Sequence, residues 1–275
     1  MAEIKLIALD LDGTLLNENK EVPFENEVAL RECAVRGIYI VPATGRTAYG
    51  IPDIVKDIPG VRYAITINGG KVVDMAENKV ISSCFLTKEK TLEVMEIAEH
   101  FSAMYDAYVG DRGVSEERFL NHMEDYGLTP GIQQLIRKTR ICYPSITEHI
   151  KKLDCPVDKV TIFVKDPSIK AQIRERLNQV EGILISSSLA CNLEINAEGA
   201  TKGAGLLELA QFLKIPREQT MAFGDGENDI SMIKEAGLGI VMENGAPFLK
   251  KIADYVTASN EDAGVAAAIK AFILG

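Results

Sequence analysis

The segment IKLIALDLDGTL, residues 4–15, decides the fold class of this chain. The run from Ile4 to Leu9 is short, largely apolar and followed by a carboxylate, which is the pattern of a strand buried on both faces of a parallel sheet. Asp10 and Asp12 stand at alternate positions, and Gly13 allows the chain to turn back so that both acids face one cavity. This arrangement predicts a Mg²⁺ site, because Mg²⁺ prefers one or two carboxylates together with waters and phosphate oxygens.

A strand-helix-strand pattern begins with this segment and continues to residue 41. Small and apolar residues recur at helical spacing over 28–34, Gly37 ends the helix, and residues 38–41 form a second apolar run. Similar runs lie at 64–67, 221–223, 239–242 and 255–257, most of them separated by helical stretches such as 202–213. This alternation predicts an α/β fold with a doubly wound parallel sheet.

The pattern changes between about Cys84 and Ser187. Helical segments near 92–101 and 169–180 alternate there with strand-like runs at 160–164 and 183–186. We therefore predict an inserted α+β domain at residues 85–187, with residues 1–84 and 188–275 forming one core. The segment 82–87 and the serine run 186–188 are the expected hinges.

The composition limits the functions that this chain can have. A hydrophobic content of 47%, without an apolar run long enough to span a bilayer, predicts a soluble protein with no membrane segment, and no signal peptide is recognisable. A net charge of -10 disfavours nonspecific binding to nucleic acid or anionic membranes. The five dispersed cysteines, never spaced as CxxC, favour the reducing cytoplasm over a disulfide framework or a zinc site. No obligate protein partner is indicated.

Polar residues stand at the ends of four predicted strands, namely Asp10, Thr44, Asn68 and Asp225. Any single one has an ordinary explanation, since strands often end in polar turn residues. The four together indicate a ligand site, because ligands of open parallel sheets bind beyond the carboxyl ends of the strands.

A second acidic stretch, GDGEND at 224–229, offers further carboxylates to the same ion. It lacks the third glycine of a dinucleotide-binding GxGxxG motif, and no Walker motif occurs in the chain. Lys202 begins a predicted helix after Thr201, so its charge and the helix N-terminus can together hold a phosphate group.

Four motifs give the chain a recognisable family resemblance. DLDGTL at 10–15, ATGR at 43–46, Lys202 and GDGEND at 224–229 resemble, in this order, the motifs of haloacid dehalogenase (HAD) superfamily phosphatases. The stretches NGG at 68–70 and GATKG at 199–203 are similar to the Cof-like branch, whose members carry an inserted α/β cap of type IIB. The resemblance implies a HAD-like core, with the inserted domain as its cap.

The resemblance also implies a role for each matching residue. Asp10 is the implied nucleophile and a metal ligand, and Asp12 is the implied general acid and base, with its main-chain carbonyl on the metal. Asp225 is the third protein ligand of Mg²⁺, and Asp229 supports the metal site from behind. Lys202 is implied as a catalytic cation, and the expected phosphate or substrate contacts are Leu11, Thr44, Gly45, Arg46, Lys202 and Asn228.

The implied activity is Mg²⁺-dependent hydrolysis of a small phosphate monoester, such as a sugar phosphate or similar metabolite, through an aspartyl phosphate. The cap would select the leaving group. Two alternatives remain open. One is a sugar phosphomutase or phosphotransferase, which returns the phosphoryl group to a sugar, and the other is a non-catalytic regulator that binds a phosphorylated metabolite.

Several basic residues have two interpretations. Arg46 either contacts the substrate or forms a surface salt bridge. Arg137, Lys138 and Arg140 either bind a second anionic group or belong to a solvated helix face, and the solvated face is the commoner use of such a charge run.

Overall fold

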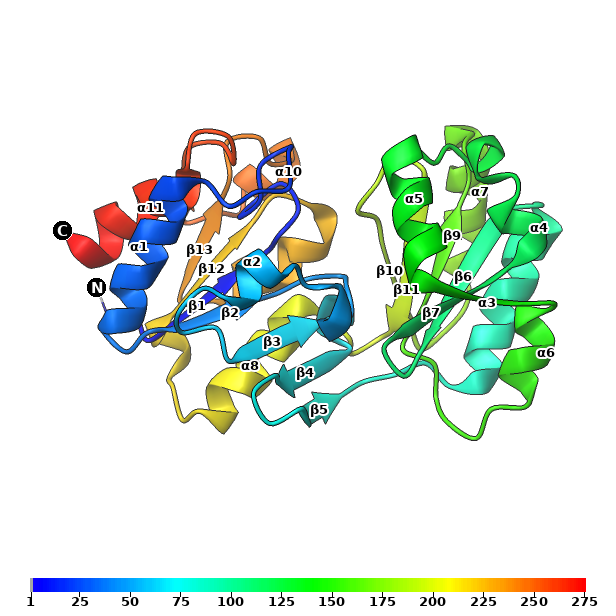
Figure 1. Cartoon of the computed structure of the whole chain (residues 1–275), viewed down its shortest axis with the longest axis horizontal. Coiled ribbons are helices and arrows are strands. Elements are labelled where there is room, and N and C mark those ends of the chain that lie inside the picture. The colour runs from blue at the N-terminus through cyan, green and yellow to red at the C-terminus, as the bar shows by residue number, and fades with distance from the viewer. Residues whose placement is uncertain (1) are drawn as a thin grey trace. The chain divides into compact units, whose positions relative to one another are not determined.

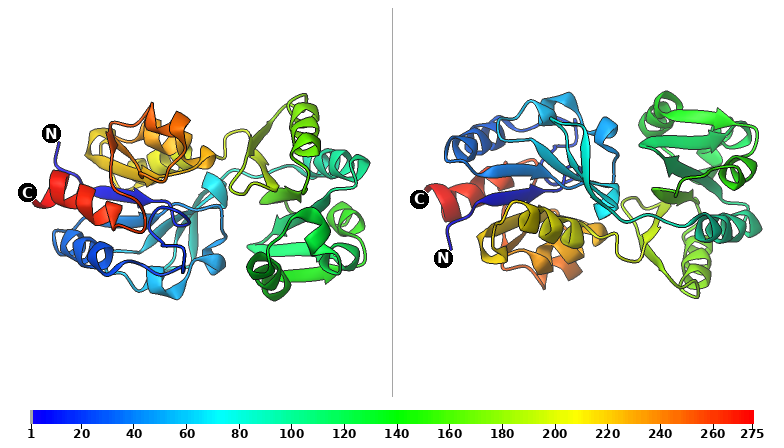
Figure 2. Two further views of the ribbon diagram at one scale, coloured as in Figure 1. Left: turned by 90° about the horizontal axis from the view of Figure 1, so that it is seen from above. Right: turned by 90° about the horizontal axis from the view of Figure 1, so that it is seen from below.

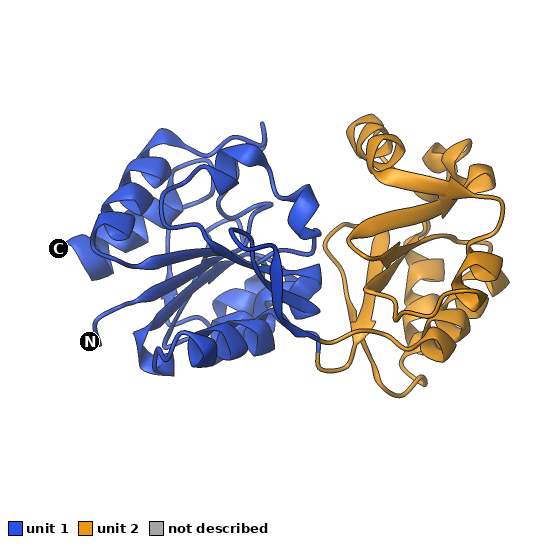
Figure 3. Cartoon of the chain, turned by 60° about the horizontal axis from the view of Figure 1, so that its bottom comes forward, with its two compact units in different colours: residues 1–83, 200–275 blue, residues 84–199 orange. Residues whose placement is uncertain are grey.

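The computed structural model describes residues 2–275, and the chain divides into two compact units (Figure 1). The first unit comprises residues 1–83 and 200–275, and the second comprises residues 84–199 (Figure 3). Within the described residues, no helix has both the length and the apolar character that crossing a membrane requires.

A five-stranded parallel sheet in the order β14-β13-β12-β1-β2 forms the centre of the first unit. The strands are β1 (Leu6–Leu9), β2 (Tyr39–Pro42), β12 (Thr220–Gly224), β13 (Leu238–Val241) and β14 (Tyr255–Val256). Leu9 is paired with Pro42 on one side and with Phe223 on the other. The predicted parallel sheet is therefore confirmed, and the carboxyl ends of β1 and β12 lie side by side.

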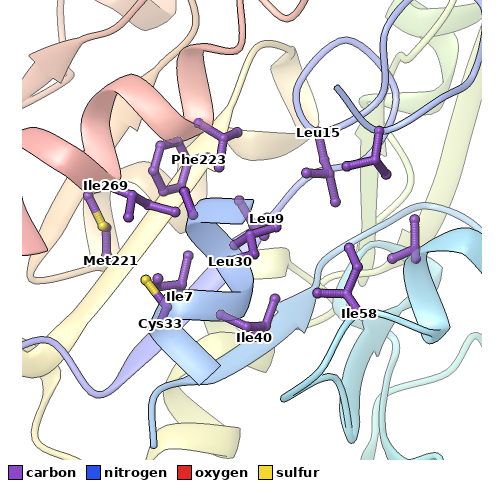
Figure 4. Close-up of a cluster of buried hydrophobic side chains, with 14 of the residues drawn as sticks. Ile7, Leu9, Leu15, Leu30, Cys33, Ile40, Ile58, Met221, Phe223 and Ile269 are labelled. Carbon is purple, nitrogen blue, oxygen red and sulfur yellow. The ribbon is translucent and has the colours of Figure 1, made fainter. Parts of the chain in front are cut away.

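Helices cover both faces of this sheet. Successive residues of β1 point to opposite faces, and those on each face pack against different helices. Ile7 and Leu9 belong to a cluster with residues of α1 and α11 (Figure 4), whereas Leu6 and Ala8 pack with residues of α8 and α9. Figure 2 shows α1 and α11 side by side. The helices of this unit are α1 (Phe24–Val35), α2 (Asp53–Lys56), α8 (Lys202–Phe212), α9 (Ile230–Glu235), α10 (Pro247–Lys250) and α11 (Gly264–Ile269).

A small antiparallel sheet of β3 (Tyr63–Thr66), β4 (Lys71–Asp74) and β5 (Lys79–Ser83) adjoins β2. The sequence predicts 64–67 as one more strand of the parallel sheet, and the structure confirms this in part, since the strand at 63–66 lies parallel to β2. Only isolated parallel bridges, such as that between Ala43 and Ile65, connect β3 with the β2 side, and its ladder partner is the antiparallel β4. The reason is the tight turn at 67–70, where Gly69 has a φ of 96° and lets the chain return at once.

The second unit contains a six-stranded sheet in the order β10-β11-β9-β6-β7-β8, antiparallel except for the pair β7 and β8. The strands are β6 (Met104–Val109), β7 (Arg112–Glu116), β8 (Arg140–Tyr143), β9 (Lys159–Phe163), β10 (Ile183–Ser186) and β11 (Asn192–Ala197). The helices are α3 (Lys88–His100), α4 (Glu117–Leu120), α5 (Pro130–Thr139), α6 (Ile146–Lys151) and α7 (Pro167–Leu177).

The second unit ends later than the expected boundary at residue 187. Residues 188–199 belong to it rather than to the core, because β11 pairs antiparallel with both β9 and β10. The serine run 186–188 lies at the end of β10 and in the turn that precedes β11, not at a hinge. The first boundary, between Ser83 and Cys84, falls within the expected segment 82–87.

Candidate active site

Asp10 and Asp225 occupy neighbouring positions at the carboxyl edge of the parallel sheet. Each follows the last paired residues of β1 and β12, and the backbone N–H of Asp10 donates to the carbonyl of Phe223 at 3.1 Å. The Asp10 side chain is buried, with 6% of the residue exposed. The register of one parallel pair thus sets both carboxylates at the same edge.

Lys202 brings a positive charge to the same place. It is the first residue of α8, which begins after Thr201, and the Thr201 hydroxyl accepts from the backbone N–H of Ala204. The fully buried ammonium lies 2.5 Å from Asp10 Oδ1 and 2.6 Å from Asp229 Oδ1. Burial lowers the pKa of Lys202, but the two carboxylates outweigh that effect and hold its pKa above the usual value, so it remains a cation.

Asp229 uses both of its carboxylate oxygens within the site. Oδ1 accepts from Lys202, and Oδ2 accepts from the backbone N–H groups of Asp225 and Gly226 at 2.9 and 3.0 Å. These contacts close the loop after β12 and hold the backbone of Asp225 in place. This arrangement agrees with the role expected for Asp229, which is to support the other groups of the site.

The carboxylates of Asp10, Asp225 and Asp229 form a compact acidic cluster, with ligand oxygens within 4.8 Å of one another. Burial, reinforced by the charge of Asp229, raises the pKa of Asp225 to about 6. Burial also raises the pKa of Asp10, against the opposing effect of Lys202. One ammonium does not balance three acids, of which Asp10 and Asp229 are buried, and hard oxygen donors with excess negative charge fit a divalent cation such as Mg²⁺.

Gly13 and Thr14 shape the position of Asp225. The Thr14 hydroxyl donates to Asp225 Oδ1 at 2.9 Å, a contact between residues 211 positions apart in the sequence. Gly13 has a φ of 91°, and a Cβ atom at this residue would lie 2.5 Å from Asp225 Oδ2. Sequence reasoning assigned no role to Thr14, although its place in the DLDGTL motif was a signal.

Gly13→Ala is expected to lower phosphatase activity by about tenfold or more, because small displacements of reacting groups cost up to about a hundredfold. Gly37→Ala is the matched control, since Gly37 also has a positive φ but nothing lies within 4 Å of the position that its Cβ atom would take. Both variants should lose about 1–2 kcal/mol of folding free energy from the left-handed backbone. Thermal unfolding and steady-state kinetics would separate the two effects, and equal activity in both variants would contradict the role given to Gly13.

The side chain of Asp12 forms hydrogen bonds with a different set of residues. Its carboxylate accepts two-pronged hydrogen bonds from Arg46, at 2.8 and 3.0 Å, and one from Lys20 at 2.9 Å. Burial acts to raise the pKa of Asp12, but Arg46 and Lys20 outweigh it and hold the pKa below the ordinary value. Arg46 forms a salt bridge, which is one of its two interpretations, while its contact with the substrate stays a prediction; the sequence analysis did not include Lys20.

The loops after β2 and β3 are tied to the loop after β12. The carbonyl of Thr44 accepts from the N–H of Asn68 at 3.0 Å, and Asn68 Oδ1 accepts from the side-chain amide of Asn228 at 3.2 Å. Thr44 Oγ1 accepts from the N–H of Arg46, and Gly45 lies between them. Asn68 was noted as a strand-end residue but received no role in the sequence analysis.

Other candidate residues are less central. The side chain of Leu11 is fully buried in the core, so only its backbone is available to a phosphate group. Arg140 pairs with Asp106 in the second unit, at 2.7 Å, whereas Arg137 and Lys138 are exposed on α5. The solvated-face interpretation therefore holds for Arg137 and Lys138.

Known proteins resemble this chain over nearly its whole length. A family model described as haloacid dehalogenase-like hydrolase matches residues 7–269. The 5-amino-6-(5-phospho-D-ribitylamino)uracil phosphatase YcsE of Bacillus subtilis (strain 168) is 32% identical over 273 residues, which cover 99% of this chain and 97% of the relative. Phosphatase YwpJ of the same strain is 30% identical over 97% of this chain and 99% of the relative.

A solved structure shares the architecture. The structure of a haloacid dehalogenase-like hydrolase from B. subtilis superposes with a TM-score of 0.85 at 29% identity, and the match covers 98% of this chain and 100% of the other. Family model, relatives and fold agree with the four ordered motifs and with the acidic cluster, whose residues come from the first and the last of these motifs. The chain belongs to the haloacid dehalogenase-like hydrolase family and is a phosphatase of that family.

Proposed function

We propose that the protein hydrolyses phosphate monoesters of small metabolites in a Mg²⁺-dependent reaction that passes through an aspartyl phosphate on Asp10. The observation that carries the proposal is the buried contact of 2.5 Å between Asp10 and Lys202 inside a cluster of three acids. A carboxylate held beside a fixed cation suits attack on an anionic substrate, because the cation offsets the charge repulsion.

The proposed metal ligands are the side chains of Asp10 and Asp225 and the main-chain carbonyl of Asp12. Asp229 is proposed to hold the site in shape, in keeping with its bonds to Lys202 and to two backbone N–H groups. When bound, Mg²⁺ would supply charge neutralisation for the phosphate oxygens.

In the first half-reaction, a carboxylate oxygen of Asp10 attacks phosphorus, and a new O–P bond forms as the bond to the leaving oxygen breaks. Lys202 offsets negative charge on the transferred group, and the proposed phosphate contacts are Thr44, Gly45 and Asn228 with the backbone of Leu11. Arg46 is proposed to contact the substrate when it leaves Asp12.

Asp12 is proposed to move protons in both half-reactions. It gives a proton to the departing alkoxide, and its carboxylate later takes one from the water that attacks the aspartyl phosphate, which releases inorganic phosphate and restores Asp10. The ion pairs with Arg46 and Lys20 favour the carboxylate form, so proton delivery requires Asp12 to leave these two cations.

The substrate is proposed to be a small phosphorylated metabolite, with the second unit acting as the cap that selects the leaving group. The relative YcsE is named as a 5-amino-6-(5-phospho-D-ribitylamino)uracil phosphatase, so this compound belongs in a screening panel. The panel also includes hexose and pentose phosphates, nucleotides, flavin mononucleotide and pyridoxal phosphate. Release of inorganic phosphate from one of them supports hydrolysis, whereas isomerised ester without free phosphate indicates a mutase.

Asp12→Asn is expected to slow the cleavage of alkyl phosphates by about a hundredfold or more, the usual contribution of a general acid or base. Formation of the aspartyl phosphate from p-nitrophenyl phosphate should suffer less, because nitrophenolate leaves without a proton. Dephosphorylation should be slow with both esters. Rapid-quench kinetics should therefore show a burst of nitrophenol followed by a slow steady state.

The control for this prediction is Lys20→Met, which removes one partner of Asp12 and leaves the carboxylate in place. It should show no burst. Equal slowing of both esters in Asp12→Asn, with no phosphorylated enzyme found by mass spectrometry after acid quench, would show that Asp12 moves no proton.

A further inference from the structure

The turn that follows β1 takes only part of its hydrogen bonds from its own backbone. Within it, the N–H of Leu15 donates to the carbonyl of Asp10 at 3.2 Å. The carbonyls of Gly13 and Leu16, in contrast, accept hydrogen bonds from side chains more than 200 positions away in the sequence. Since backbone carbonyls are strong acceptors that folded proteins satisfy, the shape of this turn depends on those distant residues.

Two asparagines supply these hydrogen bonds. Asn244 Nδ2 donates to the carbonyl of Gly13 at 2.8 Å. Asn260 is buried, and its Nδ2 donates to the carbonyl of Leu16 at 3.0 Å. The two asparagines are also joined to each other, because Asn244 Oδ1 accepts from the backbone N–H of Asn260 at 3.0 Å. This bond holds the oxygen of the Asn244 amide toward Asn260, which leaves the NH₂ group to face Gly13.

The loop at 242–246, which contains Asn244, also holds the loop after β12. The backbone N–H of Ala246 donates to the carbonyl of Asp225 at 2.9 Å. Gly245 permits this close approach, because a Cβ atom at that position would lie 3.2 Å from Asp225 Cα. The backbone of Asp225 is therefore fixed by the same short loop whose side chain reaches the turn after β1.

Asn244 thus connects the two loops that supply the acidic cluster. Its own loop is bonded to the backbone of Asp225, and its side chain bonds to the turn that begins at Asp10. The carbonyl that it holds belongs to the peptide group between Gly13 and Thr14, and the Thr14 hydroxyl donates to Asp225 Oδ1 at 2.9 Å. A shift of this peptide group would change the separation of the two carboxylates.

We propose that Asn244 is a positioning residue of the metal site, which sets the separation of Asp10 and Asp225. This inference rests on the proposed function, because it takes the Mg²⁺ site given there as its starting point. Asn244 acts through the backbone of the two loops. Mg²⁺ demands a near-ideal octahedral arrangement of its ligands, so a looser link between these loops weakens its binding.

Asn244→Ala in the full chain tests the proposal. The Mg²⁺ concentration that gives half-maximal phosphate release should rise about three- to tenfold, the usual effect of losing a neutral hydrogen bond. The kcat at saturating Mg²⁺ should fall by less than about twofold, because the bound ion restores the spacing. The rise in Tm that Mg²⁺ causes should be smaller than in the wild type, which gives a readout independent of turnover. Asn244 is exposed, so the variant should fold.

A double-mutant cycle with Asp225→Asn separates positioning from a general loss of stability. If Asn244 acts through the position of Asp225, the double variant should need less than about twofold more Mg²⁺ than Asp225→Asn alone. Asn78→Ala is the matched control, since Asn78 lies in an exposed turn of the same unit with a φ of 49°. Alanine disfavours this left-handed backbone, so the control should lose stability without any change in its Mg²⁺ requirement.

The inference is overturned if Asn244→Ala keeps the Mg²⁺ requirement and the Mg²⁺-dependent rise in Tm of the wild type. It is also overturned if Asn78→Ala shows the same effects, or if the double variant shows the full product of the two single effects. A wild type that releases no phosphate refutes the proposed function, and the Tm measurements then decide the inference by themselves. A wild-type Tm that does not respond to Mg²⁺ overturns both.

Discussion

Asp10→Asn is expected to reduce the turnover of every phosphate monoester by about 10⁴-fold or more, because loss of a nucleophile removes the covalent route entirely. The amide has nearly the volume of the carboxylate but is a poor nucleophile, so the fold should persist. Steady-state phosphate release measures the loss. Acid quench and mass spectrometry of wild-type enzyme should reveal a phosphorylated residue 10 that the variant lacks.

A stability measurement must accompany this test, because Asp10 is one of the two carboxylates that hold the buried ammonium of Lys202. Asp57→Asn provides the matched control, since it removes one exposed carboxylate from the same unit. It should retain full activity. Phosphate release by Asp10→Asn within tenfold of wild type would refute Asp10 as the nucleophile.

Exhaustive chelation with EDTA is expected to abolish turnover, by about 10⁴-fold, because a divalent cation typically supplies several kcal/mol of charge stabilisation in phosphoryl transfer. Added Mg²⁺ should restore activity. Ca²⁺ at millimolar concentration should inhibit, since its larger and more flexible coordination shell allows Asp10 to bind through both oxygens and lose its nucleophilic lone pair.

The matched variant for the metal test is Asp225→Asn, which should need a higher Mg²⁺ concentration for half-maximal activity. Mg²⁺ should also raise the Tm of the wild type more than that of Asp225→Asn, which gives a readout independent of turnover. Full turnover after chelation, with no metal detected by mass spectrometry, would eliminate the metal assignment.

The parallel sheet, and the site at its carboxyl edge, could be predicted because the local sequence pattern agrees with the packing of the strands. β1 is buried on both faces, so its apolar run is continuous, and the polar residue that ends it must lie at the sheet edge. The helix that starts at Lys202 was equally clear, because Thr201 supplies a standard N-cap. In both cases one short stretch contains the whole signal.

The missed features depend on contacts between distant parts of the chain. Nothing near Thr14 indicates that its hydroxyl bonds to Asp225, and nothing near Lys20 indicates its pairing with Asp12. β11 was assigned to the core because residues 188–199 contain no local signal for which sheet a strand will join. Such pairings are decided by tertiary packing rather than by propensity.

The buried polar residues Ser115, Asp106 and Thr161, on the neighbouring strands β7, β6 and β9, could not be predicted for the same reason. Ser115, Asp106 and Thr161 are scattered in sequence, and each is an ordinary residue within its own strand. Only the register of β6, β7 and β9 places them next to one another, and only their burial distinguishes them from an ordinary outer face.

The first unit is built from two separate parts of the chain, and this arrangement has a consequence for biosynthesis. β1 leaves the ribosome early, but its partner β12 and the cation Lys202 follow only after the second unit has been synthesised. The second unit is continuous in the chain and can fold as soon as it emerges. During that interval β1 lacks one neighbour, and its apolar residues are open to contact with chaperones or with other nascent chains. The enzyme therefore acquires its active site only after the second unit has been synthesised, when β12 joins β1.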